Sequence, residues 1–229
     1  MIEHTLVFLT YNRPALIDKR LDEVSQFIGH RDDFEVVVFD NGSTDYGVRL
    51  VLISRSQRGD FPLRIVRQDK NIGFSKGFNK AVKHAEGEKV YLISDDVTIF
   101  GDVIEALAGQ PWKKGVMGHR LIPAGAGWND FPEISIPYLD GYFLAMLRST
   151  WDRLGGFDKR FSPHDYEDVD FSHRVHKNVH FELYEVAPCP IRHAAASTIG
   201  YGAERFENTV KMRAKFAEKW ELTNEPERP

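Results

Sequence analysis

The chain has 229 residues, 42% hydrophobic and 28% charged, which is typical of a globular protein with a substantial core. Its net charge of -4 gives no sign of a general nucleic-acid binder, and its one cysteine, Cys189, excludes an internal disulfide. No apolar run approaches the roughly 20 residues that span a bilayer, and no signal peptide is evident. We therefore expect a cytoplasmic protein without a transmembrane segment, and we leave open peripheral contact with a membrane.

The first hundred residues alternate between strand-like and helix-like segments. Short apolar and β-branched runs predict strands at residues 5–9, 35–39, 63–66 and 90–93. Apolar residues at helical spacing predict helices at residues 17–28, 46–54 and 78–85. Asn12 is predicted to cap the first helix, with Pro14 in its first turn.

This β-α-β-α-β order predicts an α/β fold with a mostly parallel central sheet and helices on both faces. Ligands of such sheets bind at the carboxyl ends of the strands. Three polar clusters lie at those ends, namely Thr10-Tyr11-Asn12, Asp40-Asn41 and Asp95-Asp96. The sequence therefore predicts a ligand site at this edge of the sheet.

The second part of the chain has a different character. Residues 123–137 are rich in Gly and Pro and predict a long loop that could act as a lid. Further elements are predicted in chain order: a strand at 142–147, a short helix ending at Gly155-Gly156, a helix at 165–177, a strand at 180–186 and a helix at 204–220. In the last helix, Phe206, Val210 and Ala217 are predicted to share one side.

The predicted organisation is a single domain over residues 1–229. Its parts are a first half at 1–100, a second half at 101–202, and a C-terminal helix and tail at 203–229.

Carboxylates in three of these segments have both a chemical and a structural interpretation. Asp95-Asp96 suits Mg²⁺ or Mn²⁺, but it could also be a solvated turn. Asp40 could accept a hydrogen bond from a nucleobase, although the run up to Asp45 alone favours a turn followed by a capped helix. Glu167-Asp168 could supply a general base, whereas acids in a first helical turn are also expected from the helix dipole.

Histidines provide a weaker signal. His173, His176 and His180 have spacings of three and four residues, but Asn178 interrupts the helix, so we favour ordinary half-buried or solvated histidines. His193 stands alone in the sequence, and a lone histidine is usually structural.

Taken together, six motifs in this order resemble the GT-A fold glycosyltransferases, and specifically glycosyltransferase family 2. They span about residues 4 to 200 and read VFLTYNRP (7–14), VVVFDNGSTD (36–45), NIGFSKGFNKAV (71–82), LISDDV (92–97), LDGYFLAMLRS (139–149) and GGFDKRFSPHDYEDVDFSHRV (155–175). The last of these also resembles rhamnosyltransferases.

The resemblance implies roles for individual residues. The donor-binding residues would be Thr10, Tyr11, Asn12, Arg13, Asp40, Asn71, Gly73, Lys76 and Asp95. Asp96 and His193 would bind the metal, Asp168 would be the catalytic base with Glu167 beside it, and Arg174 would complete the motif. Ser94 departs from the pattern, because some members of the family have an acid there.

The resemblance also implies an activity. We expect an inverting enzyme that uses Mn²⁺ or Mg²⁺ and moves one sugar from a UDP- or dTDP-sugar to a hydroxyl of a glycan, lipid-linked or small-molecule acceptor. The alternatives are a sugar-1-phosphate nucleotidyltransferase, which would want a glycine-rich loop after the first strand, and a non-catalytic nucleotide- or carbohydrate-binding module. The sequence leaves the sugar, the acceptor and the oligomeric state open.

Overall fold

The computed structural model describes residues 1–126, 131, 133–134, 136–194 and 202–223. Within them the strands are β1 (His4–Thr10), β2 (Phe34–Asp40), β3 (Leu63–Arg67), β4 (Lys89–Ser94), β5 (Val97–Ile99), β6 (Gly115–Gly118), β7 (Leu121–Ile122), β8 (Tyr138–Leu139), β9 (Phe143–Leu147), β10 (Glu182–Glu185) and β11 (Ile191–His193). The helices are α1 (Pro14–Phe27), α2 (Tyr46–Arg58), α3 (Phe74–Ala81), α4 (Val103–Ala106), α5 (Arg148–Leu154), α6 (Glu167–His176) and α7 (Ala203–Trp220), with 3₁₀ turns η1 (Val82–His84) and η2 (Lys159–Phe161).

The central sheet has seven strands in the order β10-β6-β9-β4-β1-β2-β3. All neighbouring pairs are parallel except those of β9, which runs antiparallel to both β4 and β6. The predicted α/β fold with a mostly parallel sheet is therefore confirmed. Strands from both predicted halves of the chain belong to this one sheet.

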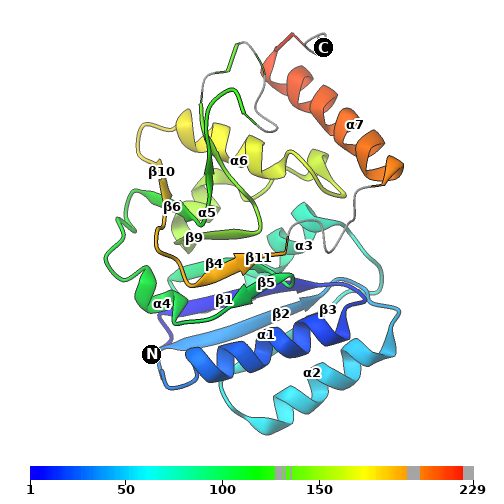
Figure 1. The fold of residues 1–229 in the computed structure, drawn as a ribbon, viewed down its shortest axis with the longest axis vertical. Helices are drawn as coiled ribbons and strands as arrows, with labels where there is room; N and C mark the ends of the chain where they lie inside the picture. Colours follow the sequence, from blue (N-terminus) through cyan, green and yellow to red (C-terminus); the bar gives the residue numbers. More distant parts are fainter. Residues whose placement is uncertain (127–130, 132, 135, 195–201, 224–229) are drawn as a thin grey trace.

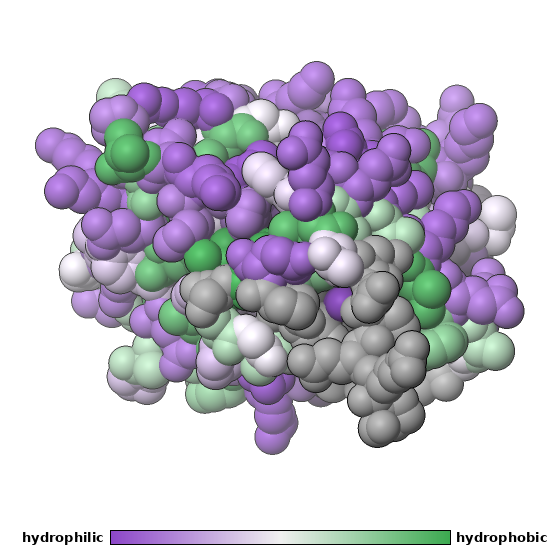
Figure 2. Space-filling model, turned by 90° about the horizontal axis from the view of Figure 1, so that it is seen from above, coloured by the Kyte–Doolittle hydropathy of each residue, from purple (hydrophilic) through white to green (hydrophobic). Residues whose placement is uncertain are grey.

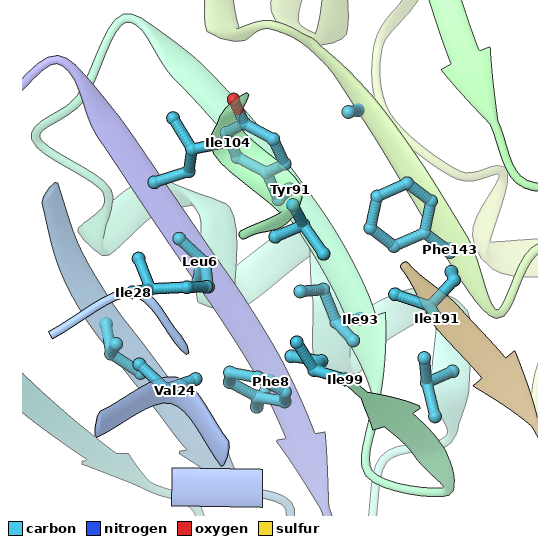
Figure 3. Close-up of a cluster of buried hydrophobic side chains, with 14 of the residues drawn as sticks. Leu6, Phe8, Val24, Ile28, Tyr91, Ile93, Ile99, Ile104, Phe143 and Ile191 are labelled. Atoms are coloured by element: carbon cyan, nitrogen blue, oxygen red, sulfur yellow. The ribbon is translucent and has the colours of Figure 1, made fainter. Parts of the chain in front are cut away.

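Alternating side chains of the central strands build two cores, one on each face of the sheet. Leu6 and Phe8 of β1 pack with α1, α2 and α4, whereas Val7 between them packs with α3, α5 and α6. Figure 3 shows the first core, where residues of β1 and β4 meet α1. Because both faces are covered by helices, the strands read as nearly continuous apolar runs.

Helix α1 follows its predicted periodicity, and its apolar residues Ile17, Leu21 and Val24 are fully buried. Pro14 lies at its start as expected, but the prediction that Asn12 caps the helix is wrong. Asn12 has a left-handed φ of 54°. Its Oδ1 instead accepts hydrogen bonds from the backbone N–H groups of Thr44 at 2.8 Å and Asp45 at 2.9 Å, so it ties the end of β1 to the start of α2.

A third apolar cluster joins α7 to α6. Met212 and Phe216 of α7 pack against Tyr166 and Val169, and Figure 1 shows α7 (orange to red) beside α6. The predicted face of α7 is wrong in part, because Phe206 is 72% exposed and Val210 is 50% exposed, although Ala217 is buried. The helix therefore buries the stripe that contains Thr209, Met212 and Phe216.

The face of the molecule in Figure 2 is mostly hydrophilic, with apolar residues in small groups among polar ones. In the described part of the chain, every helix is too short or too polar to cross a bilayer. The predicted lid at 123–137 falls partly on residues 127–130, 132 and 135, which lie outside the described residues.

Candidate active site

A pocket of about 760 Å³ opens where β1, β2 and β4 end and where α6 and α7 begin. Nine of the predicted site residues line it, and they are Thr10, Tyr11, Asn71, Gly73, Asp95, Asp96, Glu167, Asp168 and His193. Four others do not line it, namely Asn12, Arg13, Asp40 and Lys76. Segments far apart in sequence thus supply one cavity, as expected for the carboxyl edge of a parallel sheet.

The adjacent ends of β1 and β4 place Thr10 beside Asp95. The parallel register pairs Leu9 with Ser94, so the next residue of each strand reaches the same edge. The Thr10 hydroxyl donates a hydrogen bond of 2.8 Å to Asp95 Oδ2. Burial raises the pKa of Asp95 to about 6, with a further contribution from the charge of Asp96 and opposed by the Thr10 hydrogen bond. Two adjacent buried carboxylates of this kind favour a cation between or beside them.

The small sheet formed by β5 and β11 brings His193 to Asp96. These strands are antiparallel, and His193 pairs with Val97, the residue after Asp96. The His193 Nε2 atom lies 3.5 Å from Asp96 Oδ1. The His193 ring stacks on Tyr142, with ring centroids 4.0 Å apart and an interplanar angle of 14°. Adjacent ligands of an octahedral Mg²⁺ or Mn²⁺ lie about 3 Å apart, so an oxygen and an imidazole nitrogen at this separation fit such an ion.

The described residues contain a group of three possible metal ligands elsewhere. In Glu3, His4 and Asp33 the ligand atoms lie within 4.8 Å of one another. However, Lys89 Nζ is 2.5 Å from Glu3 Oε1, and Arg31 Nη2 is 2.8 Å from Asp33 Oδ2. These cations already balance both carboxylates, and the group lies at the start of β1, away from the pocket.

The loop after β2 presents Asn41 to the pocket rather than Asp40. Asp40 is buried, and its carboxylate accepts hydrogen bonds from Arg67 and from the Ser43 backbone N–H. Asn41 donates to Asn71 Oδ1 at 3.1 Å and accepts from the Ile72 N–H at 3.1 Å.

Gly73 forms part of the same wall. It has a φ of 82°, and a Cβ there would lie 2.4 Å from Ser162 Oγ, so only glycine fits. Asn41 Nδ2 donates to the Gly73 carbonyl at 3.2 Å, which ties the end of β2 to the start of α3.

Glu167 and Asp168 begin α6 and are held differently. Asp168 accepts hydrogen bonds from the backbone N–H groups of Gly141 at 3.0 Å and Val169 at 2.8 Å. The pKa of Asp168 is raised to about 7, mainly by burial and then by the charge of Asp140, and these hydrogen bonds oppose the rise. Glu167 is buried, and its Oε2 has no hydrogen-bond partner within the described residues. Burial and then the charge of Asp168 raise the pKa of Glu167 well above its usual value.

The two carboxyl groups are therefore suited to different tasks. Burial favours the protonated form of Glu167, whose Oε2 has no donor within the described residues. Asp168 is oriented by two N–H groups and can exchange a proton near neutral pH, which is the property of a general base.

Two charged residues that matter to the site were not among the predicted site residues, although Asp140 lies within the motif at 139–149. Asp140 precedes β9 and lines the pocket. Arg20 of α1 is only 2% exposed, and its charge acts on Asp95 and Asp96. Only the sheet order brings either residue near the carboxylates it influences.

Arg174, the last residue of the resembling motif, acts within the scaffold. It donates to Asp170 Oδ2 at 2.9 Å, to the carbonyl of Leu154 and to the carbonyl of Gly156 at 2.7 Å, and so joins α6 to the end of α5.

The three clustered histidines form no shared site in the structure. His173 is buried, and its ring centroid lies 4.1 Å from that of Trp220, whereas His176 and His180 are exposed. Burial lowers the pKa of His173 to about 4, with a further contribution from the charge of Lys177. The preference for ordinary histidines over a metal site agrees with these positions.

Two curated proteins are similar to parts of the chain. Poly(ribitol-phosphate) beta-N-acetylglucosaminyltransferase TarS of Staphylococcus aureus is 31% identical over 97 residues, which are 42% of this chain and 16% of that protein. Validoxylamine A glucosyltransferase of Streptomyces hygroscopicus subsp. jinggangensis is 25% identical over 218 residues, covering 75% of this chain and 51% of that protein. The chain thus spans about half the length of the second relative and less of the first.

Solved structures share the fold. The mannosyltransferase PcManGT from Pyrobaculum calidifontis, in complex with GDP-Man and Mn²⁺, has a TM-score of 0.71 at 22% identity, covering 99% of this chain and 66% of that one. Residues 1–349 of S. aureus TarS, in complex with UDP-GlcNAc, have a TM-score of 0.63 at 18% identity, covering 93% of this chain and 66% of that one. These likenesses establish the GT-A fold.

The family model described as glycosyl transferase family 2 matches residues 5–160, more than half of the chain. This range includes the ends of β1, β2 and β4, where the pocket has its polar side chains. From the match and the shared GT-A fold we conclude that the chain belongs to glycosyltransferase family 2.

Proposed function

We propose that the protein is a metal-dependent, inverting glycosyltransferase that moves one sugar from a UDP- or dTDP-sugar to an acceptor hydroxyl. The acceptor is a glycan, a lipid-linked molecule or a small molecule. The observation that carries the proposal is that one pocket holds both the Asp96–His193 pair and the Glu167–Asp168 pair. The first pair suits a cation that binds diphosphate, and the second suits removal of a proton.

The charge of the pocket supports a divalent cation. Its described lining includes seven acidic residues, Asp95, Asp96, Asp140, Asp165, Glu167, Asp168 and Glu204. Asp96 and His193 would hold Mn²⁺ or Mg²⁺, with oxygens of the donor diphosphate and water as the remaining ligands. The ion would stabilise negative charge on the departing nucleoside diphosphate.

The proposed reaction is a single displacement at the anomeric carbon. Asp168 accepts the proton of the acceptor hydroxyl as the new C–O bond forms. The bond between the anomeric carbon and the diphosphate breaks at the same time, and the nucleoside diphosphate leaves with the bonding electrons. The Gly141 and Val169 N–H groups fix the Asp168 carboxylate in one orientation throughout.

A thermal-shift panel of UDP, dTDP and GDP, each with Mn²⁺ or with EDTA, tests the donor site. GDP belongs in the panel because PcManGT is seen with GDP-Man. A nucleotide at about 100 times its dissociation constant adds roughly 2.7 kcal/mol, or on the order of 5–10 °C at this chain length. We expect such a shift for UDP or dTDP with Mn²⁺, its loss in EDTA, and its loss in Asp96→Asn.

The exposed Lys83 offers a control, because it lies outside the pocket lining and is not among the predicted site residues. Lys83→Gln should keep the shift. The absence of any nucleotide shift in the wild-type protein would refute the proposed donor site.

A further inference from the structure

Two consecutive residues directly before the catalytic pair have an unusual backbone conformation. Asp165 has a φ of 74° and Tyr166 has a φ of 69°. The left-handed region is unfavourable for residues with a Cβ, and for a bulky residue such as tyrosine it is a true exception. Such a turn persists only when its surroundings hold it, and it sets the direction in which Glu167 and Asp168 leave the loop.

Three side chains of α7 face the carboxylate of Asp165, and Nδ1 of the neighbouring His164 also lies 3.1 Å from its Oδ2. Asp165 is 8% exposed. The Thr209 hydroxyl lies 2.8 Å from Asp165 Oδ2, and Asn208 Nδ2 lies 3.2 Å from the same oxygen. Arg205 Nη2 is 3.5 Å from the other oxygen. The Thr209 hydroxyl also has the Arg205 carbonyl within 2.9 Å, but the charged acceptor is the stronger of the two.

Tyr166 is held by the same helix. It is 1% exposed, and its ring centroid lies 5.5 Å from that of Phe216. Arg213 Nη1 donates to its hydroxyl at 3.4 Å. Side chains of α7 thus hold both left-handed residues, although α7 lies some 40 residues later in the sequence.

The position of α7 places part of the helix at the proposed reaction site. Its residues Glu204, Arg205 and Asn208 line the same pocket as Asp168. Asn208 also donates to the His164 carbonyl at 2.8 Å, one residue before the left-handed pair. The helix therefore contacts every residue from His164 to Tyr166, at the end of the pocket where the proposed base lies.

We propose that Thr209 is a positioning residue for catalysis: α7, through Thr209 on Asp165, holds the left-handed turn that aims Asp168 at the acceptor hydroxyl. This inference rests on the proposed function for its catalytic consequence, but its structural consequence is independent of turnover. Removing the Thr209 hydroxyl should loosen the start of α6 and leave the metal and nucleotide residues of β1, β4 and β11 unchanged.

The test compares Thr209→Val, which keeps the side-chain shape, with Thr209→Ser, which restores the hydroxyl. Exchange of the Gly141 and Val169 amide hydrogens, both bound to Asp168, is followed by NMR. We expect exchange to accelerate at least about tenfold in Thr209→Val, the factor for losing a hydrogen bond to a charged group, and to return to the wild-type rate in Thr209→Ser. In transfer assays with a sugar donor of the nucleotide that binds, kcat of Thr209→Val should fall at least about tenfold, and the KM for the donor should be unchanged.

Lys215→Met is the matched control, because Lys215 is on the same helix but donates to the Arg160 carbonyl at 2.8 Å, away from the turn. It should alter neither exchange nor kcat. If Thr209→Val does not fold, Asn208→Ala removes two contacts to the same turn and takes its place. Wild-type exchange at both amides in these variants would overturn the inference, as would equal losses in Lys215→Met. A wild-type protein without transfer would instead contradict the proposed function.

Discussion

At the residue scale, the site depends on how strongly each carboxyl group is buried and which N–H groups face it. Asp168 is bound by two backbone N–H groups, whereas the buried Oε2 of Glu167 has no such donor within the described residues. The adjacent carboxyl groups of Glu167 and Asp168 are therefore held in different surroundings, which affect their acidity differently. This division is the usual basis for assigning acid and base roles to neighbouring carboxyls.

Replacing Asp168 with Asn should separate catalysis from stability. Because the pKa of Asp168 is raised to about 7, the folded state binds more protons than the unfolded state between about pH 4 and pH 7. Its ionisation therefore lowers the free energy of unfolding as pH rises through this window. We expect Asp168→Asn to abolish transfer, to keep the UDP–Mn²⁺ thermal shift, and to lose less stability than the wild type between about pH 4 and pH 7, because Asn does not ionise. The same pH dependence of the free energy of unfolding in both proteins would contradict the raised pKa.

Asp140 should set the pH range of activity. Its charge raises the pKa of Asp168, second only to burial. Removing this charge in Asp140→Asn should lower the pKa of Asp168, so the acid limb of the kcat/KM profile should move to lower pH. Asp158→Asn is the comparison, because Asp158 lies outside the pocket lining and should leave the limb in place. An unmoved limb in Asp140→Asn would show that another group controls it.

At the element scale, α1 places a buried cation near the acidic residues at the carboxyl edge of the sheet. Arg20 is 2% exposed and pairs with Glu23 at 3.0 Å, and Glu23 in turn accepts a hydrogen bond from the Ile99 N–H at 2.8 Å. Burial lowers the pKa of Arg20, and the charges of Glu23, Asp95 and Asp96 oppose that change. A buried cation in the first helix thus balances carboxylates in and beside the pocket.

Arg20→Met should destabilise the protein by about 3 kcal/mol, because it leaves Glu23 buried without its cation. Chemical denaturation measures the loss directly. Arg58→Met is the control on α2: its partners Asp22 and Asp60 are 58% and 27% exposed, so its loss should cost less than about 0.5 kcal/mol. Similar losses in both variants would argue against a special role for the buried pair.

At the scale of the whole molecule, the pocket exists because one sheet and one late helix meet. Strands from the first half supply Thr10, Asn41 and Asp95, and α6 from the second half supplies Glu167 and Asp168. Glu204, Arg205 and Asn208 of α7, which lies beside α6 in Figure 1, also line the cavity. No single segment of the chain contains both the proposed metal ligands, Asp96 and His193, and the proposed base, Asp168.

Much of this could be predicted from local pattern. The four strands of the first half, the helix periodicity of α1 and the mostly parallel sheet follow from apolar spacing. The signal is strongest in β1, β2 and β4, because both of their faces are buried, whereas β3 lies at the edge of the sheet and is partly exposed. Eight of the predicted residues that line the pocket lie in the resembling motifs, and His193 is the ninth. Asn12 and the face of α7 were predicted wrongly, since a cap and a buried stripe both depend on what lies opposite them in space.

The sequence by itself determined six of the helices, the strands β1 to β4, β9 and β10, and the family, because periodicity and motif spacing are properties of neighbouring residues. It missed α4, β5 to β8 and β11, which have only two to four residues each and so carry no periodic pattern. The resemblance implied that Asp96 and His193 share a metal, but only the tertiary structure showed how they meet, through an antiparallel pairing of β5 with β11 that spans almost a hundred residues. It likewise placed Asp140 where its charge acts on Asp168, and Thr209 against Asp165. These are contacts between residues distant in sequence, and their energies depend on burial and separation that exist only after the sheet and α7 have packed.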